Sequence, residues 1–192
     1  NKAVPTAVVA IGLVARRMWL GQPTWTSGRL LAMLLATGLF MQFAGNGAFQ
    51  FALGAGGLAI VVPLSFAILI VSGAWLGRMM LGEPITFRTA AAMLVLIASI
   101  VLLSVGTGDA TARTIAEVSL GVIAVTVLAA CLSGLAYGIA GVAIRSALTR
   151  GVPLSVPLLV LSLSGVVPLG LALLRAAKAR NERLREHSIY TR

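Results

Sequence analysis

The sequence predicts an all-α protein, a polytopic transmembrane helical bundle. Hydrophobic residues make up 59% of the 192 residues and charged residues only 10%, and the mean hydropathy is +1.02. A bilayer crossing needs about 20 apolar residues, and the chain holds several apolar runs of this kind, separated by short polar breaks. A water-soluble domain could not bury so much apolar surface.

Six apolar segments follow one another along the chain. They cover residues 3–15, 30–53, 57–81, 89–106, 118–144 and 152–174. The breaks between them are rich in Gly, Pro, Thr and Arg, which is typical of short turns between antiparallel membrane helices. No segment alternates polar and apolar residues as a barrel strand does. We therefore expect helices, because lipid offers no partner for unpaired backbone groups.

The first segment is short for a full crossing. Its arginines, Arg16 and Arg17, follow the apolar run, whereas a secretory signal carries its positive charge in front. We interpret the segment as the tail of a helix whose beginning is absent. Since the chain also opens without methionine and ends soon after a basic stretch, we expect it to be a fragment of a longer protein.

The basic residues in the breaks predict an orientation. The first, third and fifth breaks together carry seven of them: Arg16, Arg17, Arg29, Arg78, Arg88, Arg145 and Arg150. The second break carries none and the fourth only Arg113. The positive-inside rule therefore assigns the first, third and fifth breaks to the cytoplasm.

The basic tail after Leu174 conflicts with this orientation, because a sixth crossing would leave it outside. Two explanations stay open. The last segment, which contains Pro153, Pro157 and Pro168, is bent or re-entrant, or the tail is an unusual loop or a truncation end.

The formal net charge of +10 does not indicate nucleic-acid binding. The basic residues lie at membrane boundaries, where arginines anchor helix ends in the headgroups. The single cysteine, Cys131, lies in an apolar segment. We interpret it as a packing residue, because a disulfide needs a second cysteine.

Three side-chain amides lie inside the second segment. Gln42, Asn46 and Gln50 are four residues apart, which puts them on one face of an α-helix. Burying amides in hydrocarbon is costly unless each finds a partner, so this face should line a wet cavity. The alternative is that the amides only hold helices together.

The third and fifth segments supply the other candidates. Pro63 removes the hydrogen bond to Ala59 and opens the backbone, and Ser65 adds a hydroxyl group nearby. Ser133 and Tyr137 are four residues apart on a glycine-rich helix. Each of these candidates has a structural alternative. For the proline it is a simple kink, and for the other residues it is close helix packing or a structural hydrogen bond.

Glu83 lies at a segment boundary between Gly82 and Pro84. We expect its carboxylate to cap the next helix or to pair with Arg78 or Arg88.

Charged residues and histidines are absent from the middle of the segments between residues 30 and 174. An intramembrane metalloprotease needs a His-Glu pair at helical spacing, and a carboxylate dyad needs two acids within a span. We therefore expect no enzyme, no catalytic residues, no metal site and no cofactor.

Several stretches resemble one family. Residues 55–64 (AGGLAIVVPL), followed by 76–78 (LGR) and 81–84 (LGEP), resemble the fourth helix of the EamA-type domain of the drug/metabolite transporter superfamily. That helix has an early proline and a terminal Gly-Glu pair, and the next helix closes in glycine, as 104–106 (SVG) does. Residues 119–145, which begin SLG and end in arginine, are similar to the first helix of the second repeat.

This resemblance implies a ten-helix transporter built from two five-helix inverted repeats, with a central cavity and alternating access. Residues 1–107 would hold helices two to five of the first repeat, without the first helix. Residues 115–174 would hold the first two helices of the second repeat. Residues 175–192 would form a basic loop or tail, which departs from the family pattern.

We therefore expect an integral multi-pass protein of the plasma or inner membrane that transports or exports small organic solutes. The expected partners are a small-molecule substrate and the lipid bilayer, with no nucleic acid, and a homo-oligomer is left open. The candidate substrate-binding residues are Gln42, Asn46, Gln50, Pro63, Ser65, Ser133 and Tyr137. The alternatives are a non-transporting membrane scaffold or assembly subunit, which the basic tail favours, and an intramembrane enzyme. Amino acids, nucleosides, sugars and drugs all fit such a cavity.

Overall fold

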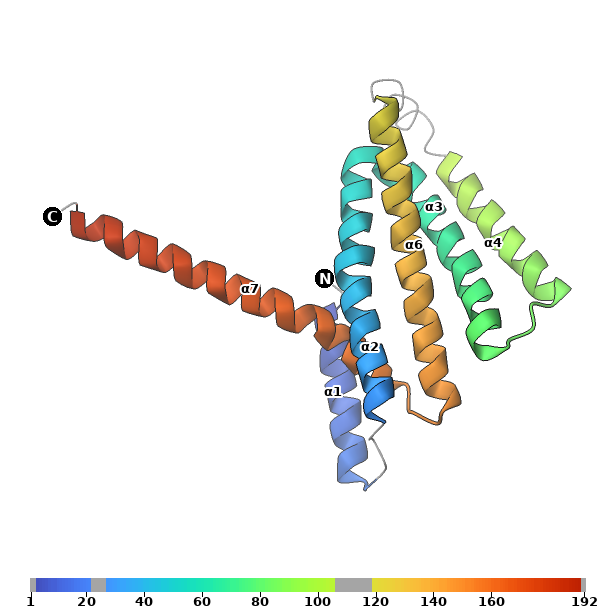
Figure 1. Ribbon diagram of the computed structural model, residues 1–192, viewed down its shortest axis with the longest axis horizontal. Helices are drawn as coiled ribbons and strands as arrows, with labels where there is room; N and C mark the ends of the chain where they lie inside the picture. The colour runs from blue at the N-terminus through green and yellow to red at the C-terminus, as the bar shows by residue number, and fades with distance from the viewer. Residues whose placement is uncertain (1–2, 22–26, 106–118, 191–192) are drawn as a thin grey trace.

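The computed structural model describes residues 3–21, 27–105 and 119–190, and in these ranges every regular element is a helix (Figure 1). The elements are α1 (Ala3–Trp19), α2 (Gly28–Phe40), the π-helical turn η1 (Met41–Asn46), α3 (Gly47–Leu81), α4 (Phe87–Val105), α6 (Leu120–Thr149) and α7 (Ser155–Tyr190). The all-helical class is confirmed, and most of the described residues of each apolar segment lie in a helix.

The elements α2, η1 and α3 form one helical run that reverses its direction at Gly57. This residue has φ 72° and ψ 169°, a backbone region that is essentially restricted to glycine. Figure 1 shows the chain turning here at one end of the bundle and returning beside itself. Ala52 before the turn and Val61 after it are both fully buried, in one cluster with Ala130 of α6. The break predicted between residues 53 and 57 is therefore a turn at a single glycine.

Helix α6 lies between α2 and the returning arm of α3 (Figure 1), and small residues let it approach α3 closely. A Cβ atom at Gly134 would overlap the carbonyl oxygen of Ser65 and lie 2.8 Å from Cβ of Ile68. Ser65 also links the two helices, because its Oγ donates a hydrogen bond to the Ala130 carbonyl oxygen at 3.2 Å. This close packing of small residues is the usual way in which membrane helices associate.

Helix α7 joins the bundle only through its first half. Its buried residues Val156, Val160 and Leu161 belong to one apolar cluster with residues of α2 and α6. The other members of the cluster are Leu30, Leu34, Ala140, Ala143, Ala147 and Val152. The helix then continues through Pro168 to Tyr190, and Figure 1 shows this part leaving the bundle at a steep angle to the other helices. The basic stretch after Leu174 thus continues as a helix as far as Tyr190.

The described part of the chain holds three helices that are long and apolar enough to cross a membrane: Gly28–Leu81, Leu120–Thr149 and Ser155–Lys178. Phe87–Leu102 is a shorter apolar helix. Large apolar side chains also point outwards, for example Leu58, Leu94 and Leu128, each about 70% exposed. An apolar exterior of this kind is suited to lipid.

Helices α3 and α6 finish, and α4 begins, on one side of the bundle (Figure 1), which we call the basic end. Arg78, Arg88, Arg145 and Arg150 all belong to these helix ends. The side chains of Arg145 and Glu83 meet there, with Nη1 and Oε2 2.8 Å apart. The third and fifth breaks of the sequence therefore lie on the same side of the bundle, as their shared charge predicts.

Candidate functional site

Three polar side chains form a hydrogen-bonded row between η1 and α6. The hydroxyl group of Tyr137 donates to Oδ1 of Asn46, and Nδ2 of Asn46 donates to Oε1 of Gln42. The Gln42 amide lies against α7, because a Cβ atom at Gly165 would overlap it. Gln42, Asn46 and Tyr137 are called the polar row below, and all three are half-buried.

The third amide, Gln50, is not part of this row and its side chain is exposed. The prediction that Gln42, Asn46 and Gln50 share a face depended on regular α-helical spacing. Residues 41–46 instead form a π-helical turn, in which the hydrogen bonds run from residue i to i+5 and change the direction of successive side chains. Such turns are rare and occur frequently at functional sites.

The remaining candidates lie deeper between the helices. Pro63 and Ser65 are buried in α3, and the hydroxyl of Ser65 is used by the α3–α6 contact described above. Ser133 is fully buried, and its hydroxyl has no hydrogen-bond partner among the described residues. Ser133 lies one turn before Tyr137 on α6, so the structure brings an unpaired hydroxyl group near the polar row.

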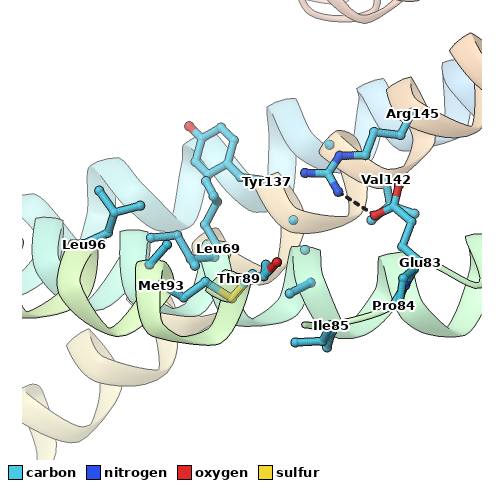
Figure 2. Close-up of a pocket in the computed structure, with 16 residues that line it drawn as sticks. Leu69, Glu83, Pro84, Ile85, Thr89, Met93, Leu96, Tyr137, Val142 and Arg145 are labelled. Carbon is cyan, nitrogen blue, oxygen red and sulfur yellow. Dashed lines mark hydrogen bonds and ion pairs between the residues drawn. The ribbon is translucent and has the colours of Figure 1, made fainter. Parts of the chain in front are cut away.

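A cavity of about 400 Å³ opens between α3, α4 and α6 (Figure 2). Its walls are mainly apolar, and they are formed by Leu69, Ile70, Gly73, Ala74, Pro84, Ile85, Ala92, Met93, Leu96, Gly138, Gly141 and Val142. The polar lining residues are Glu83, Thr89, Tyr137 and Arg145. In Figure 2 the Tyr137 ring lies beside Leu69 and its hydroxyl group points away from Thr89 and Met93. Tyr137 therefore belongs both to the cavity and to the polar row.

The Glu83–Arg145 ion pair lies at the basic end of the cavity (Figure 2). Glu83 reaches this position because α3 ends at Gly82, which has φ 68°, and the Glu83 amide then donates back to the Gly77 carbonyl oxygen. This closing turn is the usual one at a helix end in which glycine takes the left-handed conformation. Gly77 also leaves room for the pair, because a Cβ atom there would lie 2.9 Å from Oε2 of Glu83.

The expectation that Glu83 pairs with Arg78 or Arg88 is wrong, because its partner is Arg145 of α6. Arg78 and Arg88 are near Glu83 in sequence, but α6 packs against α3 along its length and brings Arg145 to the same end. The two side chains are 54% and 42% exposed. An ion pair of that exposure contributes about 0–1 kcal/mol to stability. The pair can therefore open at little cost in free energy.

Sequence reasoning missed the cavity and the role of Arg145. The only signal for the cavity was Tyr137, and no pattern in the sequence indicated that Tyr137 lies opposite α4. Within the described ranges, His, Cys, Asp and Glu side chains form no group of three or more that could hold a metal ion.

The site thus combines an apolar cavity, a weak ion pair at one end and a row of neutral hydrogen-bonding groups that begins at Tyr137. This arrangement can hold a small molecule in the cavity and order one of its ends. No family model, curated protein or solved structure matches this chain.

Proposed function

We propose that this protein is a multi-pass transporter of small organic solutes in the cell membrane, working by alternating access. The observation that carries this proposal is the cavity of about 400 Å³ between α3, α4 and α6, which runs from the Glu83–Arg145 pair to Tyr137. Cavities for small molecules typically measure about 300–1,000 Å³ and combine apolar walls with a few polar groups.

The polar row gives the cavity a route further into the bundle. Tyr137 belongs to both: its ring lines the cavity, and its hydroxyl group bonds to Asn46. A solute that displaces this hydrogen bond would meet the amides of Asn46 and Gln42. Amides inside a membrane segment are costly and are usually kept for function, which supports a role in the path of the solute.

The resemblance to the EamA-type domain supports the same function. If the chain belongs to that family, it forms part of a ten-helix protein of two inverted repeats, and its cavity lies near the repeat interface, where such transporters bind their substrates. The charge distribution favours a cytoplasmic basic end, because the breaks at this end carry most of the arginines.

A non-transporting scaffold or assembly subunit is the second candidate. It is favoured by α7, whose basic half extends away from the bundle (Figure 1) and could bind another protein or anionic headgroups.

Reconstituted vesicles can separate these functions. The vesicles would be loaded with a mixture of amino acids, nucleosides, sugars and carboxylic acids, and release would be followed by mass spectrometry. A transporter releases at least one solute class faster than protein-free vesicles do, and Tyr137→Ala slows that release. If correctly inserted protein releases none of these solutes above background, the transport proposal is wrong and the scaffold is favoured.

A further inference from the structure

We propose that the cavity binds organic monoanions with an apolar body, whose carboxylate is held by Arg145 in place of Glu83. This inference names the substrate class of the site described above, and as a statement about transport it rests on the proposed function.

The first step concerns which groups in the cavity are available. The Thr89 hydroxyl already contacts that of Thr86 at 2.8 Å, and the Tyr137 hydroxyl is used by Asn46. Arg145 binds Glu83 through Nη1, whereas a guanidinium carries five N–H donors in a planar fork. A hydroxyl group has a single donor, and a carboxylate can only accept hydrogen bonds. Arg145 thus carries most of the lining donors that remain open to a carboxylate, and its planar fork matches a carboxylate in a bidentate manner.

The second step is that Glu83 can be displaced. Both partners are about half-exposed, so solvent already competes for the pair and its opening leaves neither charge buried. Glu83 lies just beyond the glycine that ends α3, in the connection to α4 rather than inside a packed helix. A ligand carboxylate can therefore take its place on Arg145 while Glu83 turns to water.

The third step decides the sign of the ligand charge. The basic end carries Arg78, Arg88, Arg145 and Arg150 against Glu83. Clusters of one sign raise the local concentration of ligands of the opposite sign. The electrostatic field at this end of the cavity therefore favours an anion over a cation.

The fourth step concerns the body of the ligand. Tyr137 and Arg145 are eight residues apart on α6, which corresponds to a rise of about 12 Å. The cavity walls are mainly apolar, and Leu69, Met93 and Leu96 lie toward the Tyr137 end, away from Arg145 (Figure 2). A ligand with a carboxylate at one end and an aromatic or aliphatic group at the other would satisfy both ends of this space.

Binding of 4-phenylbutyrate to the protein in lipid nanodiscs tests the proposal. Calorimetric titration would compare it with the neutral 4-phenylbutanamide and the cationic 4-phenylbutylamine, with empty nanodiscs subtracted. We expect the carboxylate to bind at least about tenfold more tightly than the amide, since charge-assisted hydrogen bonds contribute a difference of that order. Equal binding of acid and amide, or tighter binding of the amine, overturns the proposal.

Two variants distinguish ligand binding from a structural role of the pair. Arg145→Gln should weaken binding of the carboxylate by about tenfold or more and leave the amide unchanged. Glu83→Gln should strengthen carboxylate binding, because it removes the competing charge, whereas a purely structural pair would make both variants weaken binding. Arg150→Gln is the matched control, since Arg150 is an exposed arginine of the basic end that does not line the cavity. If the Arg145→Gln variant binds the carboxylate as tightly as the wild type does, the assignment of Arg145 as the carboxylate-binding residue is wrong.

The same protein in proteoliposomes separates this inference from the proposed function. Carboxylate binding without release of 4-phenylbutyrate would leave the binding site in place and contradict transport. The vesicles could instead release other solutes while 4-phenylbutyrate neither leaves them nor competes for release. That result would support transport and overturn the assignment of an organic monoanion.

Discussion

The hydroxyl group of Tyr137 donates a hydrogen bond to Oδ1 of Asn46, and thereby joins the middle of α6 to a π-helical turn 91 residues earlier in the chain. Asn46 passes the connection on to Gln42, whose amide lies against Gly165 of α7. One phenol group therefore links three parts of the bundle, and its ring at the same time forms a wall of the cavity.

We expect Tyr137 and Asn46 to be energetically coupled. In a double-mutant cycle with Tyr137→Phe and Asn46→Leu, the coupling free energy should be about 0.6 kcal/mol and at most about 1.7 kcal/mol, the range for hydrogen bonds between membrane helices. The free energy of unfolding in mixed micelles measures it. Strictly additive effects of the two substitutions would show that the bond does not contribute.

Replacement of Asn46 by leucine should abolish solute release from vesicles while leaving membrane insertion and abundance near normal, because insertion depends on the apolar character of the segment, which leucine preserves. Gln50→Leu is the matched control, since Gln50 lies on the same helical run but its side chain is exposed. It should transport like the wild type. Loss of the Asn46→Leu protein from the membrane would indicate that the amide only holds helices together.

Gly134→Ala should destabilise the bundle by about 1–3 kcal/mol, the usual cost of overpacking. The added methyl group would overlap the Ser65 carbonyl oxygen, which is backbone and cannot rotate away. Gly141→Ala is the control on the same helix, because its Cβ would meet nothing within 4 Å. That change should be neutral or stabilising by up to about 1 kcal/mol, owing to the higher helix propensity of alanine. Thermal unfolding in detergent compares the two, and equal stability would contradict close packing at Gly134.

Gly57→Ala should lower stability by about 1–3 kcal/mol, although no atom lies within 4 Å of the added methyl group. The cost arises from the backbone, since φ 72° with ψ 169° is a conformation that alanine rarely adopts. Gly54→Ala, three residues earlier in helical backbone with the same open space, should not lower it. Equally stable Gly57 and Gly54 variants would mean that the chain turns without this conformation.

A cysteine at Thr86 should be protected from an impermeant thiol reagent applied outside intact cells, and a cysteine at Thr111 should react. The reason is that the breaks around residues 16–29, 78–88 and 145–150 hold seven of the eight arginines between the segments, and such breaks stay in the cytoplasm. Both variants would carry Cys131→Ser to remove the native thiol. The opposite labelling pattern would reverse the orientation.

The places of the helices among the described residues could largely be predicted, because each depends on local composition. The apolar runs, the Gly-Pro punctuation at 82–84 and the start of α6 after Ser119 all carry their signal within a few residues. The grouping of the basic breaks at one end also followed from sequence, since helices that alternate in direction return every second break to the same side. The class of function was inferred from the same pattern and from the family resemblance, and it stays a prediction.

The candidate site was predictable only in part. Gln42 and Asn46 were predicted to share a helix face from their spacing, and Tyr137 was recognised as a polar group in an apolar segment, because a polar side chain in lipid must find a partner. The hydrogen bond from Tyr137 to Asn46 could not be predicted, because it joins two segments that are distant in sequence. The exposure of Gln50 could not be predicted either, because a π-helical turn interrupts the regular spacing.

The sequence by itself therefore determined an all-helical chain suited to a membrane, with seven of the eight arginines between its apolar segments in every second break, since hydrophobicity and charge are local properties. Only the tertiary structure decided that Glu83 pairs with Arg145, that Tyr137 reaches Asn46, and that a cavity lies between α3, α4 and α6. These relationships depend on how closely α6 approaches its neighbours. That distance is set by the fit of small residues such as Gly134 against the backbone of another helix, and no single segment contains this information.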